Sequence, residues 1–94
     1  MPCFDVLWHH DHQDEPVRLV SEVGTDGFEV RKLEFFRDGR VGFAFGTREF
    51  LGTALGEMPL PSVEAINADP QFSGKLIAIE EFERLWRVHG PQHE

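Results

Sequence analysis

Apolar and polar residues alternate along the first half of the chain, and this alternation predicts β-strands. In the first run, Phe4, Val6 and Trp8 fall on one side, which is the pattern of a strand with one buried face. The polar residues 10–16 then predict a loop, because Pro16 disfavours helix at the residue before it. The predicted strands are residues 3–10, 17–23 and 28–36, with a fourth beginning at Val41.

Residues 37–40 (Arg-Asp-Gly-Arg) predict a hairpin, since Asp-Gly between apolar runs favours a tight turn. A two-residue loop would pair Glu34 with Phe43 and place a carboxylate among apolar side chains. A three-residue loop with Gly39 in a left-handed bulge would instead place Phe35 opposite the first residue of the fourth strand. We therefore predict the bulged turn.

The bulged register creates one continuous apolar face across the third and fourth strands. It leaves Phe28 and Val30 out of phase with the later apolar residues, so we expect a bend or a second bulge near Arg31 and Lys32. The predicted face consists of Leu33, Phe35, Val41, Phe43 and Phe45.

The second half of the chain predicts helices separated by proline-containing breaks. Residues 46–56 are rich in glycine and fit either an irregular fifth strand or a packed loop. Ser62 is a suitable N-cap for a short helix ending near Ala68, which Pro70 terminates. Residues 79–88 predict an amphipathic helix. Its apolar stripe is Ile79, Phe82, Leu85 and Trp86.

Together these patterns predict one α+β domain. We expect an antiparallel β-meander of four to five strands, followed by a short helix and a C-terminal amphipathic helix packed on one sheet face. A length of 94 residues suits a single domain over residues 1–94. With 40% hydrophobic and 28% charged residues, the composition is that of a folded chain.

The formal net charge of −8 narrows the choice of partners. The charge is spread evenly, since each half of the chain nets −4 by count of its charged residues. Nucleic acid is a poor candidate, because its binding depends on Lys and Arg neutralising phosphates. A negative surface would speed encounter with a basic protein, although charge retained for solubility is the simpler interpretation.

The sequence gives no sign of disulfides, cofactors or membrane insertion. Cys3 is the only cysteine, so neither an intramolecular disulfide nor a multi-thiolate zinc site can form. No glycine-rich phosphate-binding motif occurs, and we assign no cofactor. No secretory signal or long apolar span is present, and we expect a cytoplasmic protein with no membrane partner.

Residues 9–15 (His-His-Asp-His-Gln-Asp-Glu) gather three imidazoles and three carboxylates, which are suitable metal ligands. If the first strand continues to residue 12, His10 and His12 share one face, while His9 and Asp11 share the other. Each face then offers at most two ligands, so an exposed polar loop is the simpler interpretation. We assign no metal site.

The same groups could supply acid and base catalysis, together with Arg31 or Arg40 on the sheet. This set would be similar to that of a metal-free ribonuclease, but the negative charge argues against a nucleic-acid substrate. No serine or cysteine is placed as a nucleophile, and we assign no catalytic residue. We instead expect the loop to bind a partner through Trp8, His10, Asp11, His12, Asp14 and Glu15.

Three segments carry a resemblance to a known family. They are Asp14-Glu15-Pro16-Val17, Phe36-Arg37-Asp38-Gly39-Arg40 and Ile66-Asn67-Ala68-Asp69-Pro70. Over nearly its whole length, the chain resembles a family of small bacterial proteins of about this size, catalogued as a domain of unknown function. The resemblance implies a bacterial origin but no activity, so no catalytic residue carries over. Members of the family often have tyrosine near positions 20 and 43 and serine or threonine at position 78, where this chain has Val20, Phe43 and Ala78. These differences concern side-chain packing and helix capping only.

The leading hypothesis is a non-enzymatic binding protein, most concretely an immunity-type inhibitor that covers the basic active-site cleft of a bacterial toxin. It follows from small size, even acidity and the lack of a catalytic set. One alternative is a small-molecule or metal-binding protein that uses the loop from His9 to His12. Another is a small enzyme, which would need a deep pocket containing one of these histidines and an arginine.

Overall fold

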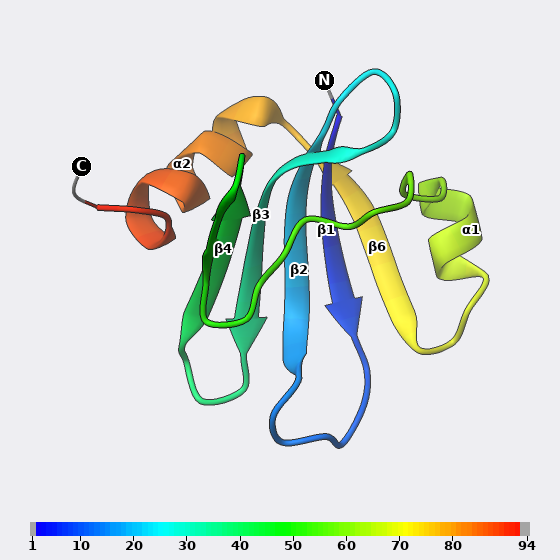
Figure 1. The fold of residues 1–94 in the computed structure, drawn as a ribbon. Helices are drawn as coiled ribbons and strands as arrows, with labels where there is room; N and C mark the ends of the chain where they lie inside the picture. Colours follow the sequence, from blue (N-terminus) through cyan, green and yellow to red (C-terminus); the bar gives the residue numbers. More distant parts are fainter. Residues whose placement is uncertain (1, 93–94) are drawn as a thin grey trace.

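The computed structural model of the protein describes residues 2–92, which form an antiparallel six-stranded sheet and two helices (Figure 1). The strand order across the sheet is β5-β4-β3-β2-β1-β6. In chain order the elements are β1 (Cys3–Trp8), β2 (Pro16–Val23), β3 (Glu29–Phe36), β4 (Val41–Phe45), β5 (Arg48–Phe50), α1 (Val63–Asn67), β6 (Phe72–Ile77) and α2 (Ile79–His89).

Strands β1 to β5 form the predicted meander, but the prediction missed β6. After α1 the chain returns to the opposite edge of the sheet and pairs β6 with β1, joining Trp8 to Phe72 and Cys3 to Ile77. The predicted α+β class is confirmed, with one strand more than expected. The return places residues 71–73 beside the end of β1, where the β1–β2 loop (residues 9–15) begins.

The predicted hairpin register is confirmed. Phe35 pairs with Val41 and Leu33 with Phe43, and Gly39 has a φ of 96°. This left-handed conformation favours glycine because it lacks a Cβ. The expected irregularity of β3 is also present, one residue earlier than predicted, where the register with β2 skips Val30.

One hydrophobic core lies between the sheet and α2. The helix presents Phe82 and Leu85 to the sheet, and Trp86 meets the rings of Phe43 and Phe45 edge-on. The predicted helix stripe therefore contacts the predicted sheet face, although Ile79 stays 38% exposed at the helix start. The buried members of this core are Cys3, Val20, Leu33, Phe82 and Leu85.

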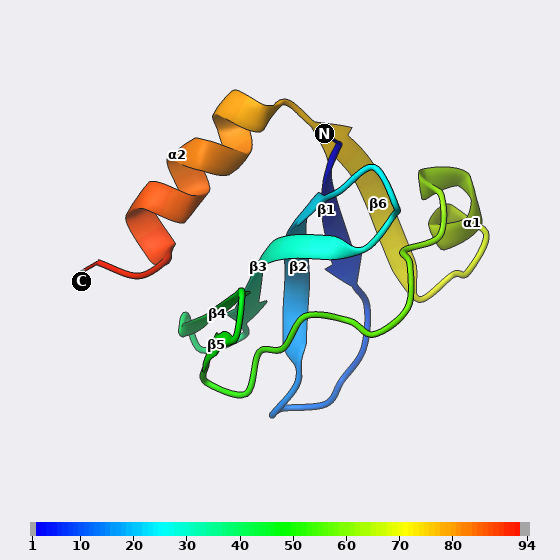
Figure 2. The same cartoon turned by 45° about the horizontal axis from the view of Figure 1, so that its top comes forward.

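A second core covers the other sheet face, where the sequence analysis predicted no cover. Phe4, Val6 and Val23 are buried there against Leu60, Val63, Ile66 and Phe72. Helix α1 supplies part of this cover, and its predicted N-cap is confirmed because Ser62 Oγ accepts a hydrogen bond from Ala65 N at 3.1 Å. Residues 51–62, which we call the crossover segment, pass over the sheet on the way to α1 (Figure 1). Both faces of the sheet are thus covered, α2 on one and the crossover segment and α1 on the other (Figure 2).

Glu29 fixes the crossover segment to the sheet through a buried polar network. Its carboxylate accepts hydrogen bonds from Ser21 Oγ at 2.8 Å and from Gly56 N at 2.7 Å. Lys32 Nζ lies 3.4 Å from the same carboxylate. The Glu29 side chain is only 3% exposed, so its carboxylate has little access to water. These contacts take the place of the hydrogen bonds to water that burial removes.

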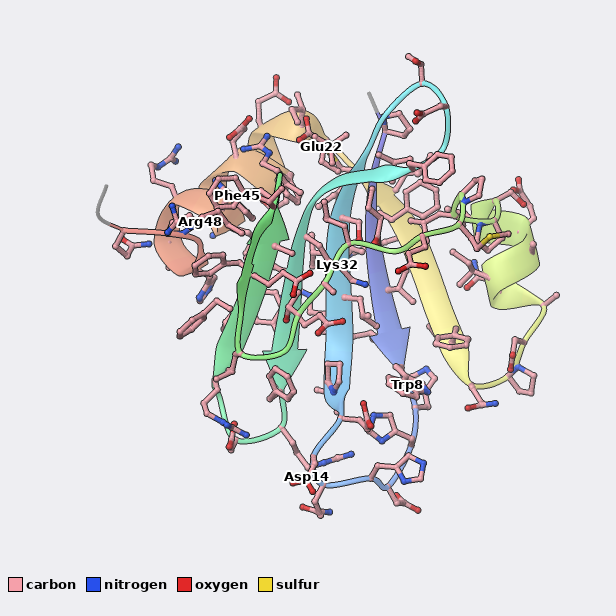
Figure 3. All side chains as sticks on the ribbon, viewed as in Figure 1. Trp8, Asp14, Glu22, Lys32, Phe45 and Arg48 are labelled. Atoms are coloured by element: carbon pink, nitrogen blue, oxygen red, sulfur yellow. The ribbon has the colours of Figure 1, made fainter. Side chains whose placement is uncertain are left out.

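Lys32 extends this network toward β4, beneath the crossover segment (Figure 3). Its Nζ lies 3.5 Å from Glu34 Oε2 and donates to Ala54 O at 3.3 Å. Glu34 in turn accepts a hydrogen bond from the buried Thr53 hydroxyl at 2.8 Å. Gly42 makes room for Thr53, because a Cβ at Gly42 would strike that hydroxyl.

Arg31 connects β3 to α2 at the opposite end of the sheet from the β1–β2 loop. It donates to Glu22 at 2.6 Å and to Glu83 at 2.7 Å, and its guanidinium lies 4.8 Å from the Phe82 ring centroid. The hydrogen bonds from Arg31 lower the pKa of Glu83 below its ordinary value.

Neither helix within residues 2–92 is long and apolar enough to cross a membrane.

Candidate functional site

The predicted binding residues occupy the loop between β1 and β2, at one end of the sheet. Figure 3 shows Trp8 at the end of β1 and Asp14 at the tip of the loop, while Glu22 lies at the far end of the sheet. The loop lies outside both cores, and residues 11–15 are exposed while Trp8 and His10 are half-buried. Exposed connections at the ends of a rigid sheet are frequent sites of binding.

Four aromatic rings form a row from β6 into the loop. Trp8 stacks on Phe72 with ring centroids 6.1 Å apart, and it meets His10 at 4.3 Å. His10 then stacks on His12 at 5.2 Å. The predicted strand over residues 3–10 is too long, because β1 ends at Trp8, so His10 and His12 do not share a strand face. Their rings are instead brought together, beside Trp8, by the conformation of the loop.

Hydrogen bonds to both ring nitrogens hold His10 in place. Its Nδ1 accepts from His12 N at 2.9 Å, and its Nε2 lies 2.8 Å from Pro16 O. A main-chain N–H needs an acceptor and a carbonyl needs a donor, so the proton of the neutral ring belongs on Nε2. Arg37 also donates to His10 O at 2.8 Å, which ties the loop to the β3–β4 hairpin. These bonds hold the loop in a defined conformation.

The far end of the aromatic row opens into a shallow hollow of about 420 Å³. Trp8 and His12 contribute aromatic surface to it, and Asp14 and Glu15 contribute carboxylates. Gln13, which the sequence analysis did not select, also lines it. Four of the six predicted binding residues therefore meet around one hollow.

The remaining two predicted residues line a neighbouring hollow. Asp11 and His10 border an open depression of about 580 Å³ together with His9 and Arg37. The two hollows share Trp8, so the loop presents a continuous surface on either side of this ring. Asp11 is nevertheless separated from Asp14 and Glu15.

Seven acids of the protein form ion pairs with residues 2–92, whereas the loop carboxylates form none, as also holds for other exposed acids such as Glu57 and Glu64. Ion pairs join Asp5 to Arg18 at 2.8 Å, Glu22 to Arg31 at 2.6 Å and Asp38 to Arg40 at 2.8 Å. In contrast, the carboxylates of the loop make no ion pair with any residue between 2 and 92; they are Asp11, Asp14 and Glu15. Their charges therefore remain available to a partner.

The geometry gives little support to a metal site in the loop. Metal binding requires a free imidazole nitrogen, whereas both nitrogens of His10 are engaged. Within the described part of the chain, no group of three or more His, Cys, Asp or Glu side chains is placed to hold a metal ion.

The enzyme alternative needs a deep pocket, and the hollow that contains His9, His10 and Arg37 is open. His9 Nε2 lies 2.7 Å from Ser73 Oγ, which is within the hydrogen-bonding distance expected between a general base and a nucleophile. No carboxylate among residues 2–92 bonds the His9 ring to orient it. The pair thus lacks the third group that a catalytic triad requires.

Sequence reasoning missed three residues that shape this site. Phe72 supports Trp8, the Gln71 side chain lies 3.5 Å from Trp8 Nε1, and Arg37 anchors the loop backbone. Phe72 and Gln71 are more than sixty positions from Trp8 in the sequence, as the separation of 63 for the Trp8–Gln71 contact shows. Only the pairing of β6 with β1 brings them to the site, and no local sequence pattern predicts that pairing.

Comparison with known proteins identifies the family but no characterised relative. No curated protein and no solved structure matches the chain. One family model, described as Domain of unknown function (DUF6881), matches residues 3–91. The match covers every helix and strand, and the protein therefore belongs to this family of unknown function.

Proposed function

We propose that the protein is a non-enzymatic binding protein that engages a basic partner protein through the β1–β2 loop. The observation that carries this proposal is the hollow in which Trp8 and His12 meet the carboxylates of Asp14 and Glu15, which have no cationic partner among residues 2–92. A lysine or arginine side chain placed there would find aromatic faces and negative charge together.

Physical chemistry favours a cationic side chain as the recognised group. An aromatic face attracts a cation by about 0.5–2 kcal/mol, depending on how far the pair is removed from water. A carboxylate adds a charge-assisted hydrogen bond. The bonds that fix His10 reduce the ordering cost of binding, because the loop already has its shape.

The net charge of −8 supports the same class of partner. Complementary charge raises the association rate and lowers the affinity for other acidic surfaces. The more specific form of the proposal is an immunity-type inhibitor that covers the basic active-site cleft of a toxin. Small size, acidity and a preformed acidic loop are the features that favour it.

Capture of a partner from a lysate of the source cells at low salt, followed by measurement of its affinity, tests the proposal. The variant Asp14→Asn/Glu15→Gln removes two loop charges, and Glu57→Gln/Glu64→Gln removes two exposed charges elsewhere. We expect the loop variant to weaken binding at least tenfold and the control to weaken it about twofold, because only close charges contribute strongly in salt. Equal losses, or binding that does not respond to salt, would contradict a role for this loop.

The alternatives predict different results. Metal analysis of protein purified without a tag separates a metal-binding protein from a protein-binding one. We expect no stoichiometric metal. A full equivalent that disappears in the His10→Ala/His12→Ala variant would replace the proposal with the metal-binding alternative.

A further inference from the structure

A third hollow lies on the α2 face of the sheet, beyond the part that α2 covers. It has a volume of about 420 Å³, and no residue of α2 lines it. Leu7 occupies its centre, paired with Arg18 on β2 and with Ser73 on β6. Because neighbouring strands are about 4.8 Å apart, Arg18 and Ser73 stand about 10 Å apart across this hollow. The lining residues are Asp5, Leu7, Arg18, Ser73, Gly74 and Lys75.

Arg18 offers hydrogen-bond donors in a fixed direction. Its Nε and Nη2 donate to the two carboxylate oxygens of Asp5 at 3.0 and 2.8 Å. Its guanidinium also lies 4.8 Å from the Phe35 ring centroid, which holds its plane. This side-on pairing leaves Nη1 without a hydrogen bond to any described residue. The Arg18 side chain is still 30% exposed, and it lines the hollow.

Lys75 adds a positive charge that nothing in residues 2–92 neutralises. It pairs with Asp5 across the strands β6 and β1, but both oxygens of Asp5 already bind Arg18. Lys75 is exposed and makes no ion pair with the described residues. The group of Asp5, Arg18 and Lys75 therefore carries a net charge of about +1 in a protein whose total charge is −8.

The other lining groups suit the remainder of a small ligand. The Ser73 hydroxyl lies at the β6 side, already hydrogen-bonded to His9. Leu7 is 45% exposed, and it offers apolar contact between the polar groups.

We propose that this hollow binds a small oxyanion, a carboxylate or a phosphate, through Arg18 Nη1 and the Lys75 ammonium. Asp5 acts as a positioning residue that holds Arg18. Leu7 contacts whatever apolar group the oxyanion is attached to. The site is independent of the proposed protein partner, since it attracts the opposite charge and involves none of the six predicted loop residues.

Titration of ¹⁵N-labelled protein at low salt tests the proposal, with inorganic phosphate and 4-methylpentanoate as separate probes. We expect saturable shifts in the amide signals of Leu7, Ser73 and Lys75. Tighter binding of one probe identifies the source of the oxyanion as a phosphate or a carboxylate. If neither probe gives saturable shifts at these amides by about 50 mM, the proposal is wrong.

Two matched variants separate a site from general electrostatics. Lys75→Met keeps the length of an exposed side chain and removes its charge, and we expect about five- to tenfold weaker binding. Arg87→Met removes one exposed positive charge from the outside of α2 and should change binding less than about twofold. An equal effect of both variants would overturn the proposal. Lys75→Met should leave capture of a basic partner intact, so the two proposals can fail separately.

Discussion

Glu29→Ala should destabilise the fold strongly, because it removes the central acceptor of the buried network under the crossover segment. The substitution leaves Ser21 Oγ and Gly56 N without their acceptor, and it leaves Lys32 with Glu34 alone. Each hydrogen bond to a charged group contributes about 1.5–3 kcal/mol. Partial entry of water offsets some of the loss, so we expect a decrease of about 3–5 kcal/mol in the free energy of unfolding.

This loss is large relative to the stability of the whole domain. At about 0.05–0.15 kcal/mol per residue, a chain of 94 residues has a free energy of unfolding of about 5–14 kcal/mol. Urea denaturation followed by tryptophan fluorescence would show the midpoint falling by about 3–5 M, given a slope of about 1 kcal/mol/M. Glu29→Gln retains one acceptor oxygen and the side-chain volume, so it should cost about 1–2 kcal/mol.

Glu57→Ala is the matched control, since it removes an exposed carboxylate from the same crossover segment. We expect it to change the stability by less than about 0.5 kcal/mol. If Glu29→Ala costs no more than about 1 kcal/mol, the network does not hold the segment and the argument fails. Amide spectra of Glu29→Gln should also show shifts near residues 51–62 and none in the β1–β2 loop.

Three further predictions test other contacts. Gly42→Ala should lower the free energy of unfolding in urea by about 2–4 kcal/mol, because the new methyl group would strike the buried hydroxyl of Thr53. A decrease of less than about 1 kcal/mol would refute the close packing. Arg31 lowers the pKa of Glu83 from its ordinary 4.5, so this pair stabilises the fold above that pH and the stabilisation disappears as the pH falls through the lower folded pKa. The difference in stability between wild type and Glu83→Gln should therefore be full at about pH 6 and absent by about pH 3, and a constant difference would contradict the pairing. Nitrogen NMR of the neutral His10 ring should show the proton on Nε2, whereas a proton on Nδ1 would refute the hydrogen bonds that fix the loop.

The hairpin register was predictable because one alternative placed a charge in an apolar face. Local sequence settled the choice at Gly39, and the structure shows Phe35 opposite Val41 as expected. The C-terminal helix was equally clear, since its stripe has a regular spacing. In both cases the decisive information lay within about ten residues, where periodicity is informative.

Strand β6 could not be recognised in the same way. Its sequence from Phe72 to Ile77 contains Gly74 and does not alternate cleanly, and glycine weakens a strand assignment. Its stability comes from pairing with β1, whose sequence lies about seventy residues earlier, as the pair of Cys3 with Ile77 shows. A pairing over such a distance is set by tertiary packing, which no local window contains.

The candidate site shows the same division between local and distant information. Alternation predicted that His10 and His12 share a face only if the first strand reached residue 12, whereas β1 ends at Trp8 and the two rings stack within the loop. The support of Trp8 by Phe72 and of the loop backbone by Arg37 comes from β6 and from the β3–β4 hairpin. Local sequence thus selected an exposed group of loop side chains, but not the residues that hold them in position.

The net charge alone gives an incomplete description of this surface, because pairing decides which charges a partner meets. Arg31 and Lys32 each lie between two carboxylates, so they add little to the external field. The β1–β2 loop retains carboxylates without partners among residues 2–92, whereas Lys75 leaves one hollow of the α2 face positive. Two surfaces of opposite sign therefore flank the end of β1. If both proposals hold, a basic protein and a small oxyanion can bind at the same time, and substitutions at the exposed Asp14, Glu15 and Lys75 test the two sites without changing a buried residue.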